Sequence, residues 1–65
     1  KLLLLTARER EILRQIALGQ KNRDIARELC ISIKTVASHR TNIMEKLGLH
    51  SVADLVRCAV QSGLI

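Results

Sequence analysis

The sequence predicts an all-α fold, a compact four-helix domain that contains a helix-turn-helix. Three observations support this prediction: apolar residues recur at helical spacing without strand-like alternation, proline is absent, and each of the three glycines follows an apolar-periodic stretch where it can close a helix. A chain of 65 residues makes one domain at most. We expect residues 1–5 to be a linker remnant from a longer protein and residues 6–65 to be the folded domain.

Two stretches in the first half of the chain have a start signal and an apolar stripe. Thr6 and Glu9 form a capping-box pattern, in which a hydroxyl and a carboxylate accept hydrogen bonds from backbone N–H groups of the first turn, so we expect a helix at residues 7–18. Asn22 is a favoured N-cap type before a second helix at residues 23–30. The stripes are Ile12, Leu13, Ile16 and Ala17 in the first helix, and Ile25, Ala26 and Leu29 in the second.

The second half of the chain repeats these signals. Ser32 is a favoured N-cap before a helix at residues 33–47, and Ser51 with Asp54 is similar to a capping box before a helix at residues 52–62. The third helix has its apolar residues on one side, namely Val36, Ile43, Met44 and Leu47. The fourth is apolar over most of its circumference and has a narrow polar stripe of Asp54, Arg57 and Gln61.

The composition favours a polyanionic partner. The formal net charge is +5 at pH 7, and the sequence contains no aromatic residue. Because single-stranded nucleic acid is usually bound by stacking its bases on aromatic side chains, duplex nucleic acid is favoured over a single strand. The apolar run Leu2–Leu5 is far shorter than the roughly 20 residues of a membrane span, so we expect no membrane partner.

The potentially reactive residues indicate that the protein is not an enzyme. The sequence has no nucleophile–base pair, phosphate-binding glycine loop or paired carboxylate site, so we expect no catalytic residue, no cofactor and no small-molecule ligand. The cysteines and histidines match no zinc-finger spacing, so we expect no metal. Cys30 and Cys58 are expected to be reduced core residues, which indicates a cytoplasmic protein, although a single disulfide is the alternative.

The second and third helices form the candidate functional pair. Ile31 and Ser32 alone separate them, and so short a connection turns the third helix sharply away from the second. Ala26 is small enough for the two helices to cross closely. Cys30 stands at the turn position where many helix-turn-helix motifs have glycine. The residues spaced to anchor the pair are Ile25, Leu29, Ile31 and Val36.

Slender hydrogen-bonding side chains are concentrated on the outward face of the third helix: Lys34, Thr35, Ser38, Thr41 and Asn42. With the small Ala37 beside them, this face can enter a major groove about 12 Å wide. The second helix opens with Lys21, Asn22 and Arg23, where backbone N–H groups and the positive end of the helix dipole favour a phosphate. A solvated helix face explains the same pattern equally well.

Two further residues of the third helix allow more than one interpretation. His39 lies at the margin of the apolar stripe and can contact a phosphate or pack against the core, and contact is slightly favoured. Arg40 lies within the stripe, where its stem can pack while its charged end reaches solvent, and we assign it no role.

Several segments match a known family in order and spacing: Leu5-Thr6-Ala7-Arg8-Glu9, Ala17-x-Gly19, Asn22-x-x-Ile25-Ala26, Ile31-Ser32-x-Lys34-Thr35-Val36 and His39-x-x-Asn42-Ile43-Met44-Glu45-Lys46-Leu47-Gly48. Together they resemble the LuxR-type helix-turn-helix domain of bacterial two-component response regulators and quorum-sensing regulators. The resemblance extends from about Leu5 to Ile65. It implies sequence-specific binding of double-stranded promoter DNA by the effector domain of a transcription regulator, acting as a dimer.

The resemblance also implies roles for individual residues. The base-contacting positions of the family fall on Ala37, Ser38 and Thr41, and its backbone-contacting positions fall on Asn22, Lys34, Thr35 and His39. Lys21 and Arg23 join the backbone contacts because they open the second helix. Relatives often have a lysine or glutamate where this chain has Ala37, so its base preference cannot be taken from a relative.

The apolar excess of the fourth helix predicts a second buried face, because one core-facing side needs an arc little wider than about 100°. We expect a homodimer on DNA, formed through Val52, Leu55, Val56 and Ala59. Alternatively, Leu2–Leu5 or another domain covers this face. Two other functions are weighed: a protein-interaction module that uses the fourth helix, and a basic membrane-surface domain, which the lack of aromatic anchors disfavours.

Overall fold

The computed structural model describes residues 2–64 and confirms the all-α prediction. Within these residues, four α-helices follow a short 3-10 helix: η1 (Leu2–Leu4), α1 (Ala7–Ala17), α2 (Asn22–Leu29), α3 (Ile33–Leu47) and α4 (Val52–Gln61). The bounds of α3 are those predicted. α1 and α4 end one residue earlier than expected, and α2 is shifted by one residue toward the N-terminus. Among residues 2–64, no helix is long and apolar enough to cross a membrane.

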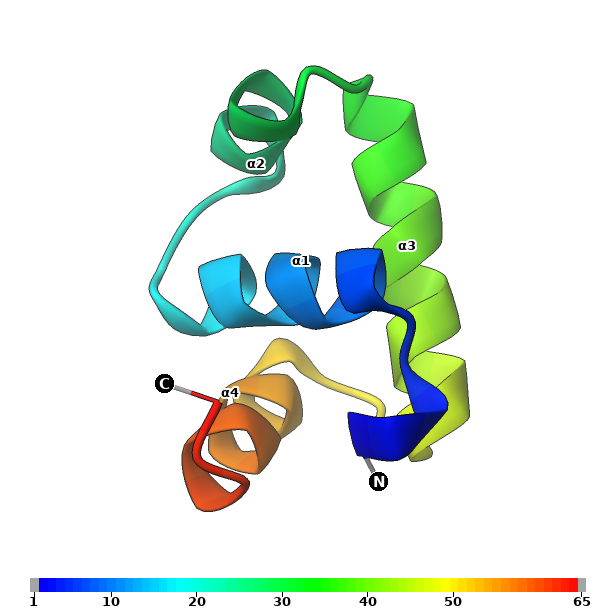
Figure 1. Ribbon diagram of the computed structural model, residues 1–65, viewed down its shortest axis with the longest axis vertical. Helices are drawn as coiled ribbons and strands as arrows, with labels where there is room; N and C mark the ends of the chain where they lie inside the picture. The colour runs from blue at the N-terminus through cyan, green and yellow to red at the C-terminus, as the bar shows by residue number, and fades with distance from the viewer. Residues whose placement is uncertain (1, 65) are drawn as a thin grey trace.

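The first helix is the centre of the arrangement. α1 contacts α2, α3 and α4. Figure 1 shows α3 as a long helix running along one side of the molecule, with α1 crossing it and lying between α2 and α4. The N-terminal half of α3 therefore lies beside α2, away from α4 (Figure 1). The pair formed by α2 and the N-terminal half of α3 therefore lies at the end of the molecule opposite to α4 (Figure 1).

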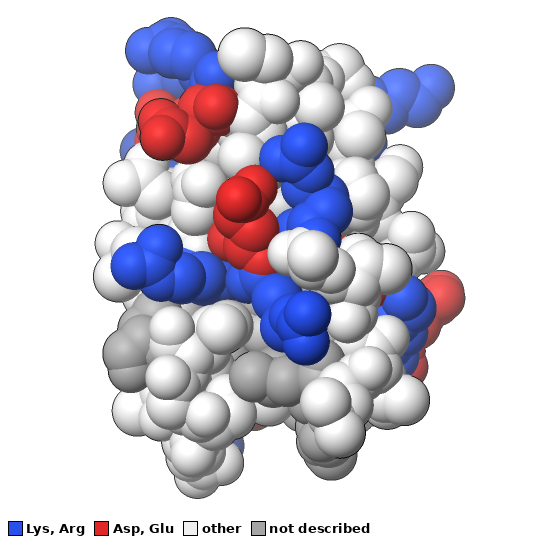
Figure 2. Space-filling view, in the orientation of Figure 1, with Lys and Arg blue, Asp and Glu red and all other residues white. Residues whose placement is uncertain are grey.

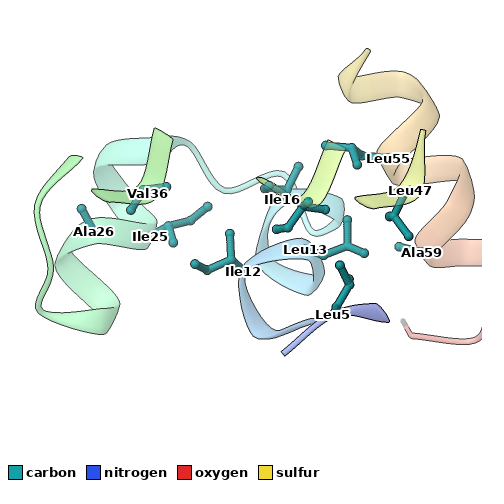
Figure 3. Packing of buried hydrophobic residues seen from close by; sticks show 11 residues of the cluster. Leu5, Ile12, Leu13, Ile16, Ile25, Ala26, Val36, Leu47, Leu55 and Ala59 are labelled. Atoms are coloured by element: carbon teal, nitrogen blue, oxygen red, sulfur yellow. The ribbon is translucent and has the colours of Figure 1, made fainter. Parts of the chain in front are cut away.

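The core forms where the apolar stripes of the helices meet, as Figure 3 shows. The deepest side chains have 0% exposure and come from all four α-helices: Ile12, Leu13, Ile25, Val36, Ile43, Leu55 and Ala59. Leu5 is also buried, at 4% exposure, although the sequence places it in the linker segment. Leu5 therefore packs with the helices although it precedes the predicted domain boundary.

Left-handed residues close the helices, as the glycine positions predicted. Gly48 has φ +67° at the end of α3, and the N–H of Leu49 donates to the carbonyl of Met44 at 3.0 Å. The same arrangement ends α2, where Cys30 has φ +57° and the N–H of Ile31 donates to Ala26 at 3.0 Å. In both places the residue after the left-handed one donates to the carbonyl five residues earlier in the chain, which is the Schellman pattern.

The cysteines differ from expectation in one respect. Cys30 is exposed, so the prediction that it belongs to the core is wrong: it stands in a left-handed turn that leads the chain out of α2. Cys58 is half-buried and packs against the core, as expected, and both thiols are free.

A buried carboxylate ties α1 to α3. The capping box at Thr6 and Glu9 is formed as predicted: Glu9 N–H donates to Thr6 Oγ1 at 3.1 Å, and Thr6 N–H donates to Glu9 Oε1 at 2.9 Å. The same Oε1 accepts a hydrogen bond from Lys46 Nζ at 2.7 Å, and the Glu9 side chain is only 5% exposed. The ammonium group of Lys46 and the N–H of Thr6 hold the pKa of the Glu9 carboxyl below its ordinary value.

Candidate nucleic-acid interface

The helix pair α2–α3 is anchored in the hydrophobic core. Ile25 and Val36 are fully buried between the helices and the rest of the core, and Ala26 is 5% exposed. Leu29 and Ile31 pack partly buried against the same cluster. The anchoring residues predicted for the pair are therefore confirmed. Because Val36 is fixed in the core, the opposite side of the first turns of α3 must face solvent.

The outward face of α3 is exposed where the sequence predicted it. The three candidate base-contacting residues, Ala37, Ser38 and Thr41, are exposed, and so are Lys34 and Thr35. The buried residues of the same helix are Val36, Ile43 and Leu47. α3 therefore presents a surface of small and slender side chains that a groove of nucleic acid can accommodate.

Two threonine hydroxyls on this face are held by hydrogen bonds within the protein. Ser32 Oγ accepts from the N–H of Thr35 at 3.0 Å, which confirms Ser32 as the N-cap, and the two hydroxyls lie 2.8 Å apart. Thr41 Oγ1 donates to the carbonyl of Ala37 at 3.2 Å. The second bond fixes what Thr41 can offer to a ligand, because its hydroxyl proton points back along the helix.

The start of α2 differs from the prediction. The N-cap is Lys21, so the expectation that Asn22 caps this helix is wrong. Asn22 is instead the first helical residue, and Arg40 Nη1 donates to its side-chain oxygen. Because guanidinium nitrogens are obligate donors, the carboxamide oxygen of Asn22 faces Arg40, and its NH₂ group is left available to another acceptor. This contact is the role of Arg40 that could not be assigned from the sequence.

The cations nearest the outward face have no carboxylate partner within residues 2–64. The ion pairs in this part of the chain join Arg8 to Glu11, Lys46 to Glu9 and Arg57 to Asp54. Lys21, Arg23 and Lys34 are exposed and belong to none of these pairs. Figure 2 shows basic side chains interspersed with acidic ones over one face of the molecule. The first turn of α2 also carries Asp24, so the starts of α2 and α3 together keep an excess of positive charge, which suits a polyanion.

An exposed helix packed against a second helix is the arrangement of a helix-turn-helix, and comparison with known proteins identifies its family. The model of the family described as bacterial regulatory proteins, luxR family, matches residues 3–59. The chain belongs to this family. It is a DNA-binding helix-turn-helix domain of the type found in bacterial regulatory proteins, and the predicted family and DNA-binding role are thereby confirmed.

Two relatives place the LuxR-family domain within longer proteins. It is 50% identical over 60 residues to the uncharacterized response regulatory protein YgeK of Escherichia coli strain K12, an alignment that covers 92% of this chain and 41% of that protein. It is 48% identical over 62 residues to the oxygen regulatory protein NreC of Staphylococcus aureus strain JH9, covering 95% of this chain and 29% of that protein. The chain therefore spans less than half the length of these relatives.

In this LuxR-family domain, the four α4 residues predicted to form a dimer lie on two different sides of the helix, one buried and one more exposed. Leu55 and Ala59 have 0% exposure and pack in the core of their own chain, so their assignment to a dimer face is wrong. Val52 is 44% exposed, Val60 is 56% exposed, and Val56 is half-buried between them. The valines are four residues apart and share one side of α4. We call the side of α4 that carries these three valines the valine face.

Sequence reasoning missed one exposed residue of α3. Ile33 is the first residue of the helix and is 52% exposed. It stands three residues before Val36, a spacing at which apolar residues usually share the buried side. The available signal was that Ile33 lies in the same turn as the polar Lys34 and Thr35. The helical pattern alone does not show whether an apolar residue in that turn is exposed or buried.

Proposed function

We propose that the domain binds double-stranded DNA with the N-terminal half of α3 in the major groove. One observation carries this proposal: Ala37, Ser38 and Thr41 are exposed on a helix whose opposite side is fixed in the core. A groove about 12 Å wide admits a helix with such short side chains, and base edges are read there. Ala37, Ser38 and Thr41 are accordingly the proposed base-contacting residues.

The proposed contacts to the DNA backbone surround this face. They are made by residues that start α2 and by residues on the first turns of α3: Lys21, Asn22, Arg23, Lys34, Thr35 and His39. The exposed charges of Lys21, Arg23 and Lys34 support electrostatic attraction. The NH₂ group of Asn22, left unused by Arg40, suits a phosphate oxygen. His39 is half-buried, which leaves part of its ring accessible for such a contact.

Duplex binding measured against salt concentration tests this proposal. Each phosphate contact made by a cation contributes about −0.9 to the slope of log K against log salt, so Lys34→Ala should weaken binding to every duplex and reduce the slope by about that amount. Arg57→Ala is the matched control, because it removes an exposed cation from α4. Thr41→Ala should change base preference. If both α3 substitutions leave duplex affinity and base preference unchanged, α3 is not the reading helix.

We also propose that two domains bind DNA as a homodimer through the valine face of α4. Its exposed side chains support a partner surface, and a two-fold pair of domains would read two half-sites of opposite orientation. Val60→Asp should weaken binding to a duplex with two half-sites while leaving binding to one half-site intact. Gln61→Asp is the control, because it adds the same charge on the neighbouring polar side. Equal affinity of the Val60→Asp variant and the parent for both duplexes would rule out this dimer.

The full-length protein is proposed to be a cytoplasmic response regulator in which this domain is the effector. The relatives named above support this, since one is called a response regulatory protein and both extend well beyond the matched region. The proposed role is binding without catalysis, and without a cofactor or small-molecule ligand in this domain. The exposed valine face supports one alternative, a protein-interaction module, which would associate stably without DNA and show no preference among duplexes.

A further inference from the structure

The first turns of α3 expose a set of methyl groups that the core does not use. Ile33 is 52% exposed although it is a large apolar residue at the start of the helix. Ala37 and Thr41 follow at intervals of four residues and are exposed as well. Residues four apart on a helix are neighbours on its surface. Ile33, Ala37 and Thr41 therefore form a continuous strip, which we call the methyl strip.

The hydrogen bond of Thr41 makes this strip more apolar than its composition indicates. Thr41 Oγ1 donates its proton to the carbonyl of Ala37 at 3.2 Å. A hydroxyl has one proton to donate, so Thr41 can offer a ligand its methyl group and the lone pairs of its oxygen, but no further donor. Ala37 offers a methyl group alone. Two of the three proposed base-contacting residues therefore lack a hydrogen-bond donor for a base.

The chemistry of the major groove has one feature that matches an apolar strip. Thymine presents a C5-methyl group there beside its O4 acceptor, whereas adenine, guanine and cytosine present no methyl group. Contact between alanine or threonine methyl groups and the thymine methyl is a recurrent means of reading this base. Long donors such as arginine or lysine, which read guanine, are absent from the strip.

From these observations we infer that this domain selects its DNA sites by packing the methyl strip against thymine methyl groups in the major groove. Ile33 is thereby a specificity-determining residue in addition to Ala37 and Thr41. Ser38, which lies beside the strip, is left to read a neighbouring base by hydrogen bonding. This inference rests on the proposed placement of α3 in the major groove.

Deoxyuridine provides a direct test, because it differs from thymidine only by the missing methyl group. A preferred duplex is first selected from random sequences with the parent domain. Each thymine of that duplex is then replaced in turn by deoxyuridine, and affinity is measured by fluorescence anisotropy. From the transfer free energy of one methyl group, each contacted thymine should cost about fourfold in affinity when its methyl is removed. Replacing a thymine outside the contact by deoxyuridine should leave the affinity unchanged.

Paired variants identify which side chain reads which thymine. Thr41→Ser removes the methyl and keeps the hydroxyl, so it should abolish the deoxyuridine penalty at one position. Thr41→Val keeps the methyl and removes the hydroxyl, so it should preserve that penalty. Ile33→Ala should abolish the penalty at another position. The control is Leu18→Ala, an equivalent truncation of a 55% exposed side chain beyond the end of α1, which should leave every penalty unchanged.

Each outcome bears on the inference. A parent domain that binds its selected site specifically but shows no deoxyuridine penalty, or a selected site without contacted thymines, overturns the methyl reading and leaves the proposed function intact. The same is true if Thr41→Val loses the penalty as Thr41→Ser does. A parent domain that prefers no duplex over random sequence overturns the proposed function, and the methyl reading falls with it.

Discussion

The ion pair between Glu9 and Lys46 should stabilise the fold far more than the surface pairs of this chain. The Glu9 carboxylate is 5% exposed and accepts from Lys46 Nζ at 2.7 Å and from the N–H of Thr6 at 2.9 Å. Lys46→Met leaves that carboxylate buried with the backbone N–H as its remaining donor. Because α1 contacts α2, α3 and α4, loosening its attachment to α3 affects the whole domain.

The size of the effect follows from the exposure of the two partners. A hydrogen bond to a charged group contributes about 1.5–3 kcal/mol, whereas breaking a fully buried ion pair costs about 3–5 kcal/mol. The side chain of Lys46 is 38% exposed, so the pair retains some hydration and the lower range applies. We expect Lys46→Met to reduce the free energy of unfolding by about 2 kcal/mol, which lowers Tm by roughly 8–16 °C in a domain of this size.

Urea denaturation followed by circular dichroism measures this loss. Glu9→Gln keeps an acceptor for Thr6 and loses the charge, so it should cost about 1–2 kcal/mol, and the double variant should show a coupling of about 1 kcal/mol or more. Glu11→Gln is the control, since the 3.0 Å pair of Glu11 with Arg8 is about half exposed on both sides. It should cost about 0.5 kcal/mol or less. Equal losses for Glu9→Gln and Glu11→Gln would refute the reasoning.

The pH dependence provides an independent check on the same pair. The pKa of Glu9 is lowered from its ordinary value of 4.5 in the folded protein. Its contribution to stability is therefore fully present above about pH 4.5 and is lost as the pH falls through the folded pKa. The parent should lose stability on acidification more steeply than Glu9→Gln. Parallel curves for the two proteins would show that Glu9 titrates alike in the folded and unfolded states.

Three further substitutions test the scaffold of the helix pair by the same denaturation measurement. Cys30→Gly should raise the free energy of unfolding by about 0.5 kcal/mol, because a left-handed φ of +57° strains an L-residue and glycine adopts it freely. The gain is small because glycine loses more entropy on folding. A loss of stability would contradict this prediction. Ile43→Ala should lower the free energy of unfolding by about 2–5 kcal/mol, because Ile43 has 0% exposure and its truncation leaves a cavity; a cost under about 1 kcal/mol would mean that the site collapses. Arg40→Met should lower the free energy of unfolding by about 1 kcal/mol in the parent and by much less in an Asn22→Ala background, because Arg40 donates to Asn22 across the helix pair. Additive losses would mean that the two side chains act separately.

Much of the fold was predictable because its signals are local. Capping residues such as Thr6 and Ser32 satisfy backbone groups within one turn, and a glycine such as Gly48 closes a helix through its own φ. The side of α3 that bears Val36 was predictable for a related reason. Helical periodicity depends on neighbours three and four residues away, and these are fixed once the helix forms. The exposure of Ser38 and Thr41 followed from the same periodicity.

Which side chains are buried, and which polar groups pair, depends on which helices meet, and only the tertiary structure decided this. The core side of α4 could not be chosen from its sequence, because apolar residues cover most of its circumference; packing against α1 buries Leu55 and Ala59 and leaves the valine face exposed. The partners of Glu9 and Asn22 are Lys46 and Arg40, many residues away in sequence. Ile33 has the spacing of a core residue and is exposed. Spacing along one helix determines which side chains share a face, but burial and polar partners depend on the other helices that approach it.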